Sequence, residues 1–402
     1  MADFGGGEQD LFREEARAWL AANFPPSLKA DPAGQAAAIL GETPSEDAQL
    51  WATRMGEKGW GTPTWPRAYG GGGLSPAQAR ILSEEMAALG ARNPIGGMGV
   101  MMLGPTLIEV GTEAQKQRHI PPIVRGVLRW CQGYSEPGSG SDLASLQTRC
   151  EDKGDHWLVN GQKVWTSGAN LADWCFCLVR TDPTRKHDGI SFILIDMKSP
   201  GVEARPIRLI NGASPFCETF FTDVKVAKEN LVGPLNGGWT IAKRLLQFER
   251  ENISASLGGG NPVLGQIASV DSIAKRYIGV GEDGRLEDDA LRSPLAAHQM
   301  EARAFQLTTR RAAIEARANQ GPTAATSIMK FAGAKLAQDR TELALEIMGA
   351  QGLGWEGDAF DPAERGATRA WLRSKANSIE GGTSEINLNV VSKRVLGLPD
   401  PK

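Results

Sequence analysis

The sequence predicts an α+β protein, helical at both ends with a β region between, and two changes in hydrophobic period predict this order. Apolar residues recur every three or four positions in the first and last parts of the chain, as on one face of a helix. Between these parts the period falls to two, as on one face of a strand. We therefore expect an N-terminal all-α domain at 1–126, a central β domain at 127–235 and a C-terminal helical domain at 236–402.

The N-terminal region carries the helical pattern most clearly in two segments. In the first, Phe12, Ala16 and Trp19 follow one another at spacings of three and four. The second runs from Pro76 to Leu89. Pro25-Pro26 interrupts the pattern between them and indicates a loop.

The central region reads as antiparallel strands. His156–Trp165 is predicted to be a hairpin, because Asn160-Gly161 suits a type I′ turn. Further strands are expected at Asp173–Arg180, Gly189–Met197 and Glu218–Val226. Strands that follow one another without crossover helices form a β-barrel or sandwich rather than a Rossmann sheet.

Helices return in the C-terminal region, separated by short polar or glycine-containing connections. They are expected at about 237–258, 262–279, 291–319, 323–349 and 383–396.

Composition and charge exclude several classes of protein. The net charge of -3 gives a nucleic acid no electrostatic attraction, so no nucleic-acid partner is expected. No apolar stretch approaches the roughly 20 residues of a membrane span, and the N-terminus lacks the pattern of a secretory signal. The five cysteines are odd in number and have no framework spacing, which indicates a reducing compartment. We expect a cytoplasmic protein without a membrane partner, and the scattered histidines predict no metal site.

Two segments of the β region carry candidate ligand-binding residues. Gln132–Asp142 is rich in glycine and serine and lies where helices give way to strands, so its amides and hydroxyls could line a ligand, or it could be a plain connecting loop. Lys163–Gly168 combines an indole with two hydroxyls. A flat heteroaromatic ligand would need such a stacking surface and such donors, although a buried tryptophan before a turn gives the same pattern.

Two further segments carry candidate carboxylates. On the helix Trp239–Ile253, Glu249 falls on the apolar stripe with Leu245 and Leu246. A carboxylate kept from water has a raised pKa and suits a general base, whereas a buried ion pair is the alternative. In Ser378–Ile386, two glycines interrupt regular secondary structure, and the threonine after them can cap the next helix. Glu380, in the same segment, is a second candidate carboxylate.

Taken in order, these segments resemble the acyl-CoA dehydrogenase family along nearly the whole chain. The matching stretches are Tyr134–Leu143, Asn160–Gly168, Phe220–Val226 with Asn230–Gly233, and Glu380–Ile386. Trp130–Pro137 is similar to the pattern of a bacterial branch of the family.

The resemblance implies both a fold and a reaction. The fold is an N-terminal helical domain, a central β domain and a C-terminal four-helix bundle. The reaction is FAD-dependent α,β-dehydrogenation of an acyl-CoA to the 2-enoyl-CoA, with electrons passed to an electron-transferring flavoprotein. A homodimer or homotetramer, in which a neighbouring subunit completes the FAD site, is also implied.

The resemblance also implies roles for individual residues. Residues flanking the isoalloxazine and ribityl of FAD would be Gln132, Tyr134, Ser135, Trp165, Thr166 and Ser167. Those near the adenine half and the substrate mouth would be Arg292, Gly349, Gln351, Gly352, Thr383 and Glu385. Ser141 would lie beside FAD and the CoA-bearing end of the substrate, and Arg250 would lie on the substrate side.

The catalytic base has two possible positions. Many family members place it directly before Gly-Thr in the terminal motif, where this chain has Gly381, and Glu380 lies one residue earlier. Others use the glutamate of a Glu-Arg pair on the first helix of the bundle, which Glu249-Arg250 matches. The apolar-face argument independently favours Glu249, with Glu380 as the alternative.

Two alternative functions stay open from the sequence alone. The same fold could carry a different flavin chemistry, such as that of a desulfinase, nitroalkane oxidase or flavin monooxygenase. The chain could also be a non-catalytic subunit of a hetero-oligomer. The acyl group cannot be read from the sequence.

Overall fold

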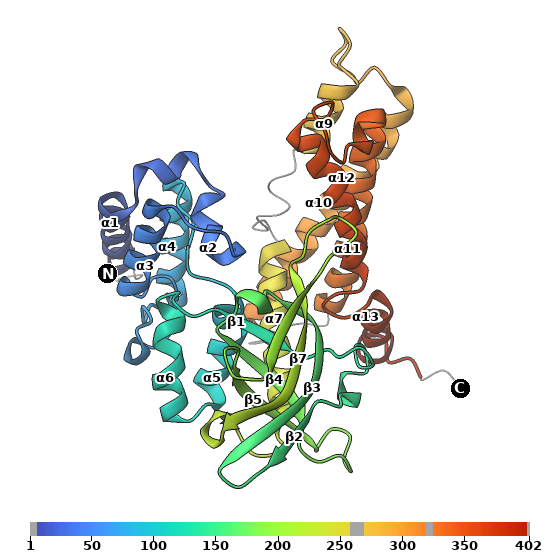
Figure 1. Cartoon of the computed structure of the whole chain (residues 1–402). Coiled ribbons are helices and arrows are strands. Elements are labelled where there is room, and N and C mark those ends of the chain that lie inside the picture. Colours follow the sequence, from blue (N-terminus) through green and yellow to red (C-terminus); the bar gives the residue numbers. More distant parts are fainter. Residues whose placement is uncertain (1–5, 258–268, 319–324, 400–402) are drawn as a thin grey trace. The chain divides into compact units, whose positions relative to one another are not determined.

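The computed structural model of the chain describes residues 6–257, 269–318 and 325–399. The chain divides into two compact units (Figure 1). The first comprises residues 1–207 and 215–248, and the second comprises residues 208–214 and 249–402. The predicted division into three domains is finer than this and stays a prediction.

The first unit begins with helices. They are α1 (Gly6–Asn23), α2 (Ala37–Leu40), α3 (Glu46–Lys58), α4 (Pro76–Leu89), α5 (Gly104–Val110) and α6 (Glu113–Val124). Helix α4 has the predicted bounds because Ser75 caps it: the Ser75 hydroxyl accepts from the Gln78 amide, and the Gln78 side chain accepts from the Ser75 amide. Thr112 and Gln115 start α6 in the same way.

The predicted apolar stripes form the core of this helical part. Ala16 of α1, Trp51 of α3 and Ile81 of α4 are each 1% exposed or less and belong to one cluster. On α4, Glu85 is buried as well, where Arg13 and Arg17 of α1 hold its carboxylate by hydrogen bonds of 2.7 to 3.2 Å. The guanidinium groups lower the pKa of Glu85, so its carboxylate stays ionised. These ion pairs link α1 to α4.

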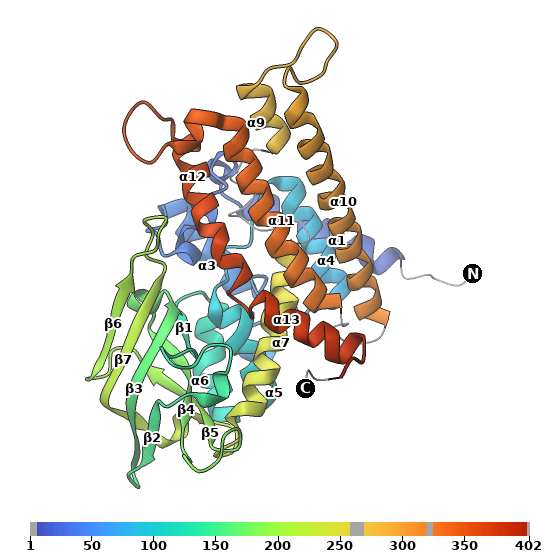
Figure 2. The same ribbon diagram turned by 90° about the vertical axis from the view of Figure 1, so that its right-hand side faces the viewer.

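The β region is confirmed, and its strands form one sheet among the described residues. They are β1 (Trp130–Gly133), β2 (Arg149–Asp152), β3 (His156–Ser167), β4 (Trp174–Arg180), β5 (Ile190–Asp196), β6 (Val202–Ile207), β7 (Phe216–Ala227) and β8 (Leu231–Val232). Their order is β6-β7-β3-β2-β4-β5-β8, with β1 paired to β4 (Figure 2). Most pairs are antiparallel, but β1 and β2 both run parallel to β4, so the sheet is mixed.

The hairpin predicted at Asn160-Gly161 is wrong. Strand β3 runs straight through it, and the real turn between β2 and β3 lies at Gly154, whose φ is 90°. A type I′ turn needs positive φ at both central residues, and Asn160 does not have it. Instead, the Asn160 side chain accepts from the Asp223 amide (2.8 Å) and donates to the Asp223 carboxylate (3.0 Å), which supports a bulge in the neighbouring strand β7.

Helix α7 (Gly238–Leu257) follows the sheet, and its part up to Phe248 belongs to the first unit. Ile241, Ala242 and Leu245 are buried there, in one cluster with residues of α5, α6 and the strands β4 and β5. This apolar face of α7 is the stripe that the sequence predicts.

The second unit is helical, as predicted. It contains α9 (Val270–Tyr277), α10 (Asp289–Ala318), α11 (Ala325–Met348), α12 (Pro362–Ser374) and α13 (Ser384–Val390). Helix α11 contacts each of the other four (Figures 1 and 2). The sequence analysis missed α12, which starts with a complete capping box of Asp361 and Glu364.

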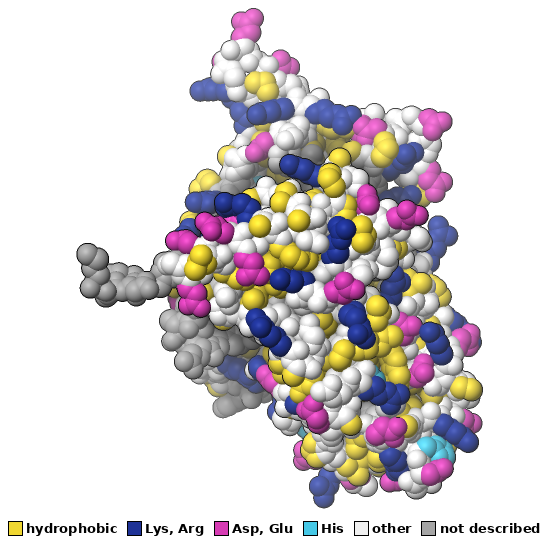
Figure 3. Space-filling model, turned by 90° about the vertical axis from the view of Figure 1, so that its left-hand side faces the viewer, with side chains coloured by type: hydrophobic (Ala, Val, Ile, Leu, Met, Phe, Trp, Pro, Cys, Tyr) yellow, Lys and Arg dark blue, Asp and Glu magenta, His cyan; other side chains and the backbone are white. Residues whose placement is uncertain are grey.

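The surface agrees with the near-neutral charge of the sequence. On the face shown in Figure 3, basic and acidic side chains are interspersed, with small apolar areas between them. Among the described residues, no helix has the length and apolarity needed to cross a bilayer.

Candidate functional site

The indole of Trp165 is turned outward by a bulge at the end of β3. Buried side chains alternate along this strand at Trp157, Val159 and Lys163, so regular alternation would point residue 165 inward. A register shift against β7 between Lys163 and Thr166 inserts an extra residue, and Trp165 takes a φ of 61°. The indole is therefore 56% exposed, whereas Thr166 is fully buried. Positive φ at a bulky residue is strained, and such strain gathers at ligand sites.

Polar atoms without partners occur at the residue after Trp165 and on strand β1. The hydroxyl of Thr166 and the side-chain amide nitrogen of Gln132 are buried and have no hydrogen-bond partner in the structure. A buried polar atom that lacks a partner costs free energy, so both atoms are suited to meet a ligand. An exposed indole together with free polar atoms fits a flat heteroaromatic group such as an isoalloxazine.

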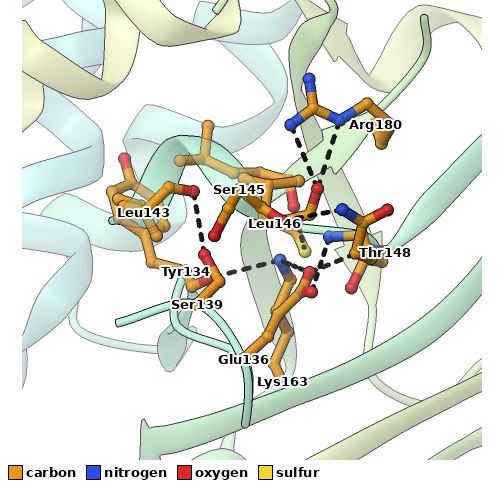
Figure 4. A network of polar contacts seen from close by, with 12 residues as sticks. Tyr134, Glu136, Ser139, Leu143, Ser145, Leu146, Thr148, Lys163 and Arg180 are labelled. Atoms are coloured by element: carbon orange, nitrogen blue, oxygen red, sulfur yellow. Dashed lines mark hydrogen bonds and ion pairs between the residues drawn. The ribbon is translucent and has the colours of Figure 1, made fainter. Parts of the chain in front are cut away.

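The loop after β1 is pinned to β3 at its first residues. The Val164 amide donates to the Ser135 carbonyl (2.8 Å), and the Lys163 ammonium donates to the Tyr134 carbonyl (3.1 Å). The structure thus brings Tyr134 and Ser135 together with the strand segment that carries Trp165 (Figure 4).

A buried ion pair lies under this loop. The Lys163 ammonium, fully buried, is 2.7 Å from the Glu136 carboxylate, which is 8% exposed. The amides of Gln147 and Thr148 donate to the same carboxylate at 2.6 and 2.8 Å. Burial opposes ionisation of Glu136 most strongly, but the Lys163 charge and these hydrogen bonds hold its pKa below the ordinary value. The carboxylate is therefore ionised at neutral pH.

The far end of the same loop is held by Arg180 of β4. Its guanidinium donates to the carbonyls of Ala144 (2.6 Å) and Leu146 (3.1 Å), and also to those of Arg185 (2.7 Å) and Lys186 (2.8 Å) in the loop after β4. The two loops are therefore fixed to each other, as Figure 4 shows for the first of them. The four carbonyl oxygens stabilise this buried cation, and the charges of Glu136 and Asp182 act on it as well.

Ser141, the residue expected beside the CoA end of the substrate, is exposed at the tip of the loop. Its neighbour Asp142 pairs with Lys186 across the two loops at 2.8 Å. The site residues on the first unit thus lie on one continuous scaffold built from β1, the loop 134–148 and β3.

In the second unit, the terminal motif forms the start of α13. The Thr383 hydroxyl accepts from the Ile386 amide (3.2 Å), which confirms the predicted cap, and Glu385 is exposed in the first turn. Glu380 is exposed, and Arg373 of α12 holds both of its oxygens, at 3.2 and 2.6 Å. Its carboxylate is already engaged by a cation.

The other residues expected around the adenine half of FAD lie in two segments of the second unit, the start of α10 and the turn after α11. Gly349 has a φ of 56° in the turn after α11, and Gln351 follows it, half-buried. Gly352 is packed so closely that an added Cβ would lie 2.7 Å from the Leu345 carbonyl oxygen. Arg292 is at the start of α10, paired with Asp289, and its Nε atom is buried without a partner.

The side chains of Glu249 and Arg250 lie outside the described residues. Their backbone is helical in α7, four and five residues beyond the fully buried Leu245. The position of Glu249 on the apolar face therefore stays a sequence prediction.

Sequence reasoning missed the roles of Glu136, Lys163 and Arg180. One signal was available: alternation in β3 puts Lys163 in phase with Trp157 and Val159, so a lysine occupies an inward position. No local signal marks Arg180 as a link between two loops, since its partners are backbone carbonyls from other segments.

Comparison with known proteins covers each part of the chain. Residues 6–127, 131–224 and 236–396 match the N-terminal, middle and C-terminal domain models of acyl-CoA dehydrogenases. Acyl-CoA dehydrogenase IpdE1 of Mycobacterium tuberculosis is 35% identical over 396 residues, 96% of this chain and 97% of that protein. Acyl-CoA dehydrogenase FadE34 of the same organism is 37% identical over 365 residues. The match covers 90% of this chain and 48% of FadE34.

Solved structures agree with these matches. The Tcur3481-Tcur3483 steroid ACAD has a TM-score of 0.76 at 30% identity, with 100% of each chain covered. The ChsE4-ChsE5 complex from Mycobacterium tuberculosis has a TM-score of 0.74 at 29% identity, again with 100% of each chain covered. With its three domain models in order and a near-complete relative above 30% identity, the chain belongs to the acyl-CoA dehydrogenase family and is an oxidoreductase of that type.

Proposed function

We propose that this protein binds FAD and oxidises an acyl-CoA to the 2-enoyl-CoA. One observation carries the proposal: in a chain of this family, the exposed Trp165 is followed directly by Thr166, whose hydroxyl is buried and has no hydrogen-bond partner. The two together suit a flat ring with acceptor atoms along its edge. When bound, FAD supplies the acceptor for the hydride that leaves the β carbon.

The residues that would hold FAD are those that the resemblance implies. Gln132, Tyr134, Ser135, Trp165, Thr166 and Ser167 would hold the ring and ribityl. Arg292, Gly349, Gln351, Gly352, Thr383 and Glu385 would serve the adenine half and the mouth of the site. The exposed Ser141 would meet FAD and the CoA-bearing part of the substrate, and Arg250 would meet the substrate.

The base that removes the α proton is Glu249 in this proposal. It follows the buried Leu245 by four residues, the spacing at which the sequence predicts a shared helix face. A carboxylate there would be drier than one at the surface, which brings its pKa nearer to the working pH. Glu380 is the less suitable candidate, because Arg373 holds both of its oxygens and its side chain is 42% exposed.

The test is reduction of the bound flavin by acyl-CoA in the absence of oxygen. Glu249→Gln should slow the loss of flavin absorbance by about a hundredfold or more, since a general base contributes roughly that factor. Glu380→Gln is the matched control and should reduce at close to the wild-type rate. Full activity in Glu249→Gln would rule out the assignment, and a wild-type protein unable to take up FAD would rule out the function itself.

The substrate class is a further part of the proposal. A similar solved structure is that of a steroid ACAD, which favours a bulky acyl group over a straight chain. Acyl-CoAs of varied length, branching and ring content should be compared by the rate of flavin reduction. A clear preference for straight short chains would contradict this part alone. An electron-transferring flavoprotein is the proposed acceptor, tested by its reduction when substrate is added.

A second candidate role is that of one chain in a hetero-oligomer. The similar structure of the ChsE4-ChsE5 complex favours this role over a homodimer or homotetramer. Co-purification from the native host separates the two. A partner chain that is needed for FAD binding would establish the hetero-oligomer, whereas full activity of the isolated protein would support the homo-oligomer.

A further inference from the structure

Lys163 is a charged residue in an interior position that a hydrophobic side chain could fill. It is fully buried in β3, in phase with the core residues Trp157 and Val159. Removing a lysine from water is expensive, and a buried ion pair is often no more stable than a packed apolar pair. A buried pair such as Lys163–Glu136 is therefore weak evidence for stability, and the geometry it enforces is the feature to explain.

The hydrogen bonds of the Lys163 ammonium both lead to one loop. The ammonium donates to the Tyr134 carbonyl and to the Glu136 carboxylate, at 3.1 and 2.7 Å. One residue further along β3, the Val164 amide donates to the Ser135 carbonyl at 2.8 Å. Three consecutive loop residues are thus attached to two consecutive strand residues, and the strand bulges immediately afterwards at Trp165.

The Glu136 carboxylate, in turn, holds the far side of the loop through hydrogen bonds. It accepts the amides of Gln147 and Thr148, while the Glu136 amide and carbonyl are both bonded to Ser139. The ammonium therefore lies at the centre of a network whose arms reach Tyr134 on one side and Thr148 on the other (Figure 4). All of these contacts lie within the first unit and need no second chain.

We propose that Lys163 is a positioning residue for the flavin. By holding the Tyr134 carbonyl and, through Glu136, the rest of the loop, it sets the separation between the Tyr134–Ser135 segment and the outward indole of Trp165. This inference rests on the proposed FAD site. The ammonium itself stays under the loop and contacts backbone and carboxylate, so it acts through the residues it holds.

The test compares three variants and one surface control in the whole chain. Lys163→Met removes the cation while keeping a long unbranched side chain, but it leaves Glu136 buried and unpaired. Lys163→Met/Glu136→Gln removes both charges, so no unpaired charge remains in the core. Arg180→Met removes another buried cation, which holds the 144–146 segment and not Tyr134.

FAD affinity and the visible circular dichroism of bound flavin are the measurements, because a purely structural role would not alter the dichroism of flavin that stays bound. Both Lys163 variants should bind FAD about tenfold to a hundredfold more weakly, the range expected from loss of a charge-assisted hydrogen bond. Their remaining bound flavin should show altered dichroism. Arg180→Met, which leaves the bond to the Tyr134 carbonyl intact, should weaken FAD binding less than either Lys163 variant and leave the dichroism of bound flavin unchanged. Lys153→Met, which alters a surface lysine in the turn between β2 and β3, should match the wild type.

Each other outcome overturns the inference. Wild-type affinity and dichroism in the double variant would show that the pair does not position flavin. An equal loss of FAD in Arg180→Met would indicate general loosening of the loop, and loss of folding in both Lys163 variants would show that the pair serves the fold. Failure of the wild type to bind FAD would instead refute the proposed function, so the two failures are distinct.

Discussion

Acid should destabilise this protein through His119, a neutral histidine buried in α6. The ring is 1% exposed and lies edge-on to Trp130 and Trp174, at 5.3 and 5.1 Å between ring centroids. Burial, and to a lesser extent the Arg118 charge, lowers the pKa of His119 from 6.5 to about 4. The folded state therefore resists protonation over a range in which the unfolded chain accepts a proton.

The sign and size follow from this difference in pKa. Between pH 6.5 and pH 4 the unfolded state binds more protons than the folded state, so stability falls as the pH falls through this window. The full difference is worth about 3 kcal/mol. Because the folded ring is still mostly neutral at pH 5, roughly 2 kcal/mol is already lost there relative to pH 7.

The assay is urea unfolding at pH 7 and pH 5 for the wild type and for His119→Phe, which keeps an aromatic ring between the two indoles. All other acid-sensitive groups titrate alike in both proteins, so subtracting the two pH effects isolates His119. The wild type should lose roughly 2 kcal/mol more than the variant between the two pH values. An equal loss in both proteins would refute a neutral, buried His119.

Two further predictions concern the sheet. Gly161→Ala should lower stability by about 1–3 kcal/mol, because its Cβ would lie 2.6 Å from the Thr148 hydroxyl oxygen and 2.7 Å from the Thr148 Cα. Gly138→Ala, with no atom within 4 Å of the added Cβ, should leave the melting temperature nearly unchanged, and equal melting temperatures in the two variants would disprove the contact. The five cysteines are free and buried, and burial raises the pKa of Cys150 to about 12. A thiol reagent at mildly alkaline pH should therefore label none of them in the native protein and all of them in urea; rapid native labelling of Cys150 would contradict its burial.

The candidate site on the first unit could be proposed from the sequence because its residues stand in short motifs. Gln132 and Tyr134, and likewise Trp165 and Thr166, lie in segments whose residue types suit a ligand, and the resemblance then implied their roles. What the motifs could not give is the outward turn of Trp165, because the extra residue that causes it is defined only against the register of β7. Glu380 shows the same limit, since its engagement by Arg373 depends on the packing of α12.

The hairpin error has a similar origin. Asn160-Gly161 carries the local signal of a tight turn, and the same two residues also suit a bulged ladder. The side-chain bonds of Asn160 to Asp223, 63 residues away, decide between the two. A local signal cannot report a partner at that distance.

The sequence by itself determined the order of helical and β regions, the bounds of α4, the cap at Thr383 and the family. Each depends on hydrophobic period, on residues within one turn of each other, or on motifs of consecutive residues. All of these can be read from the sequence without knowing which distant segments meet. Tertiary structure alone decided the mixed strand order, the exposure of Trp165 and the burial of Lys163 against Glu136. These depend on which distant segments lie side by side, because strand pairing and ion pairing join residues that local pattern leaves unconnected.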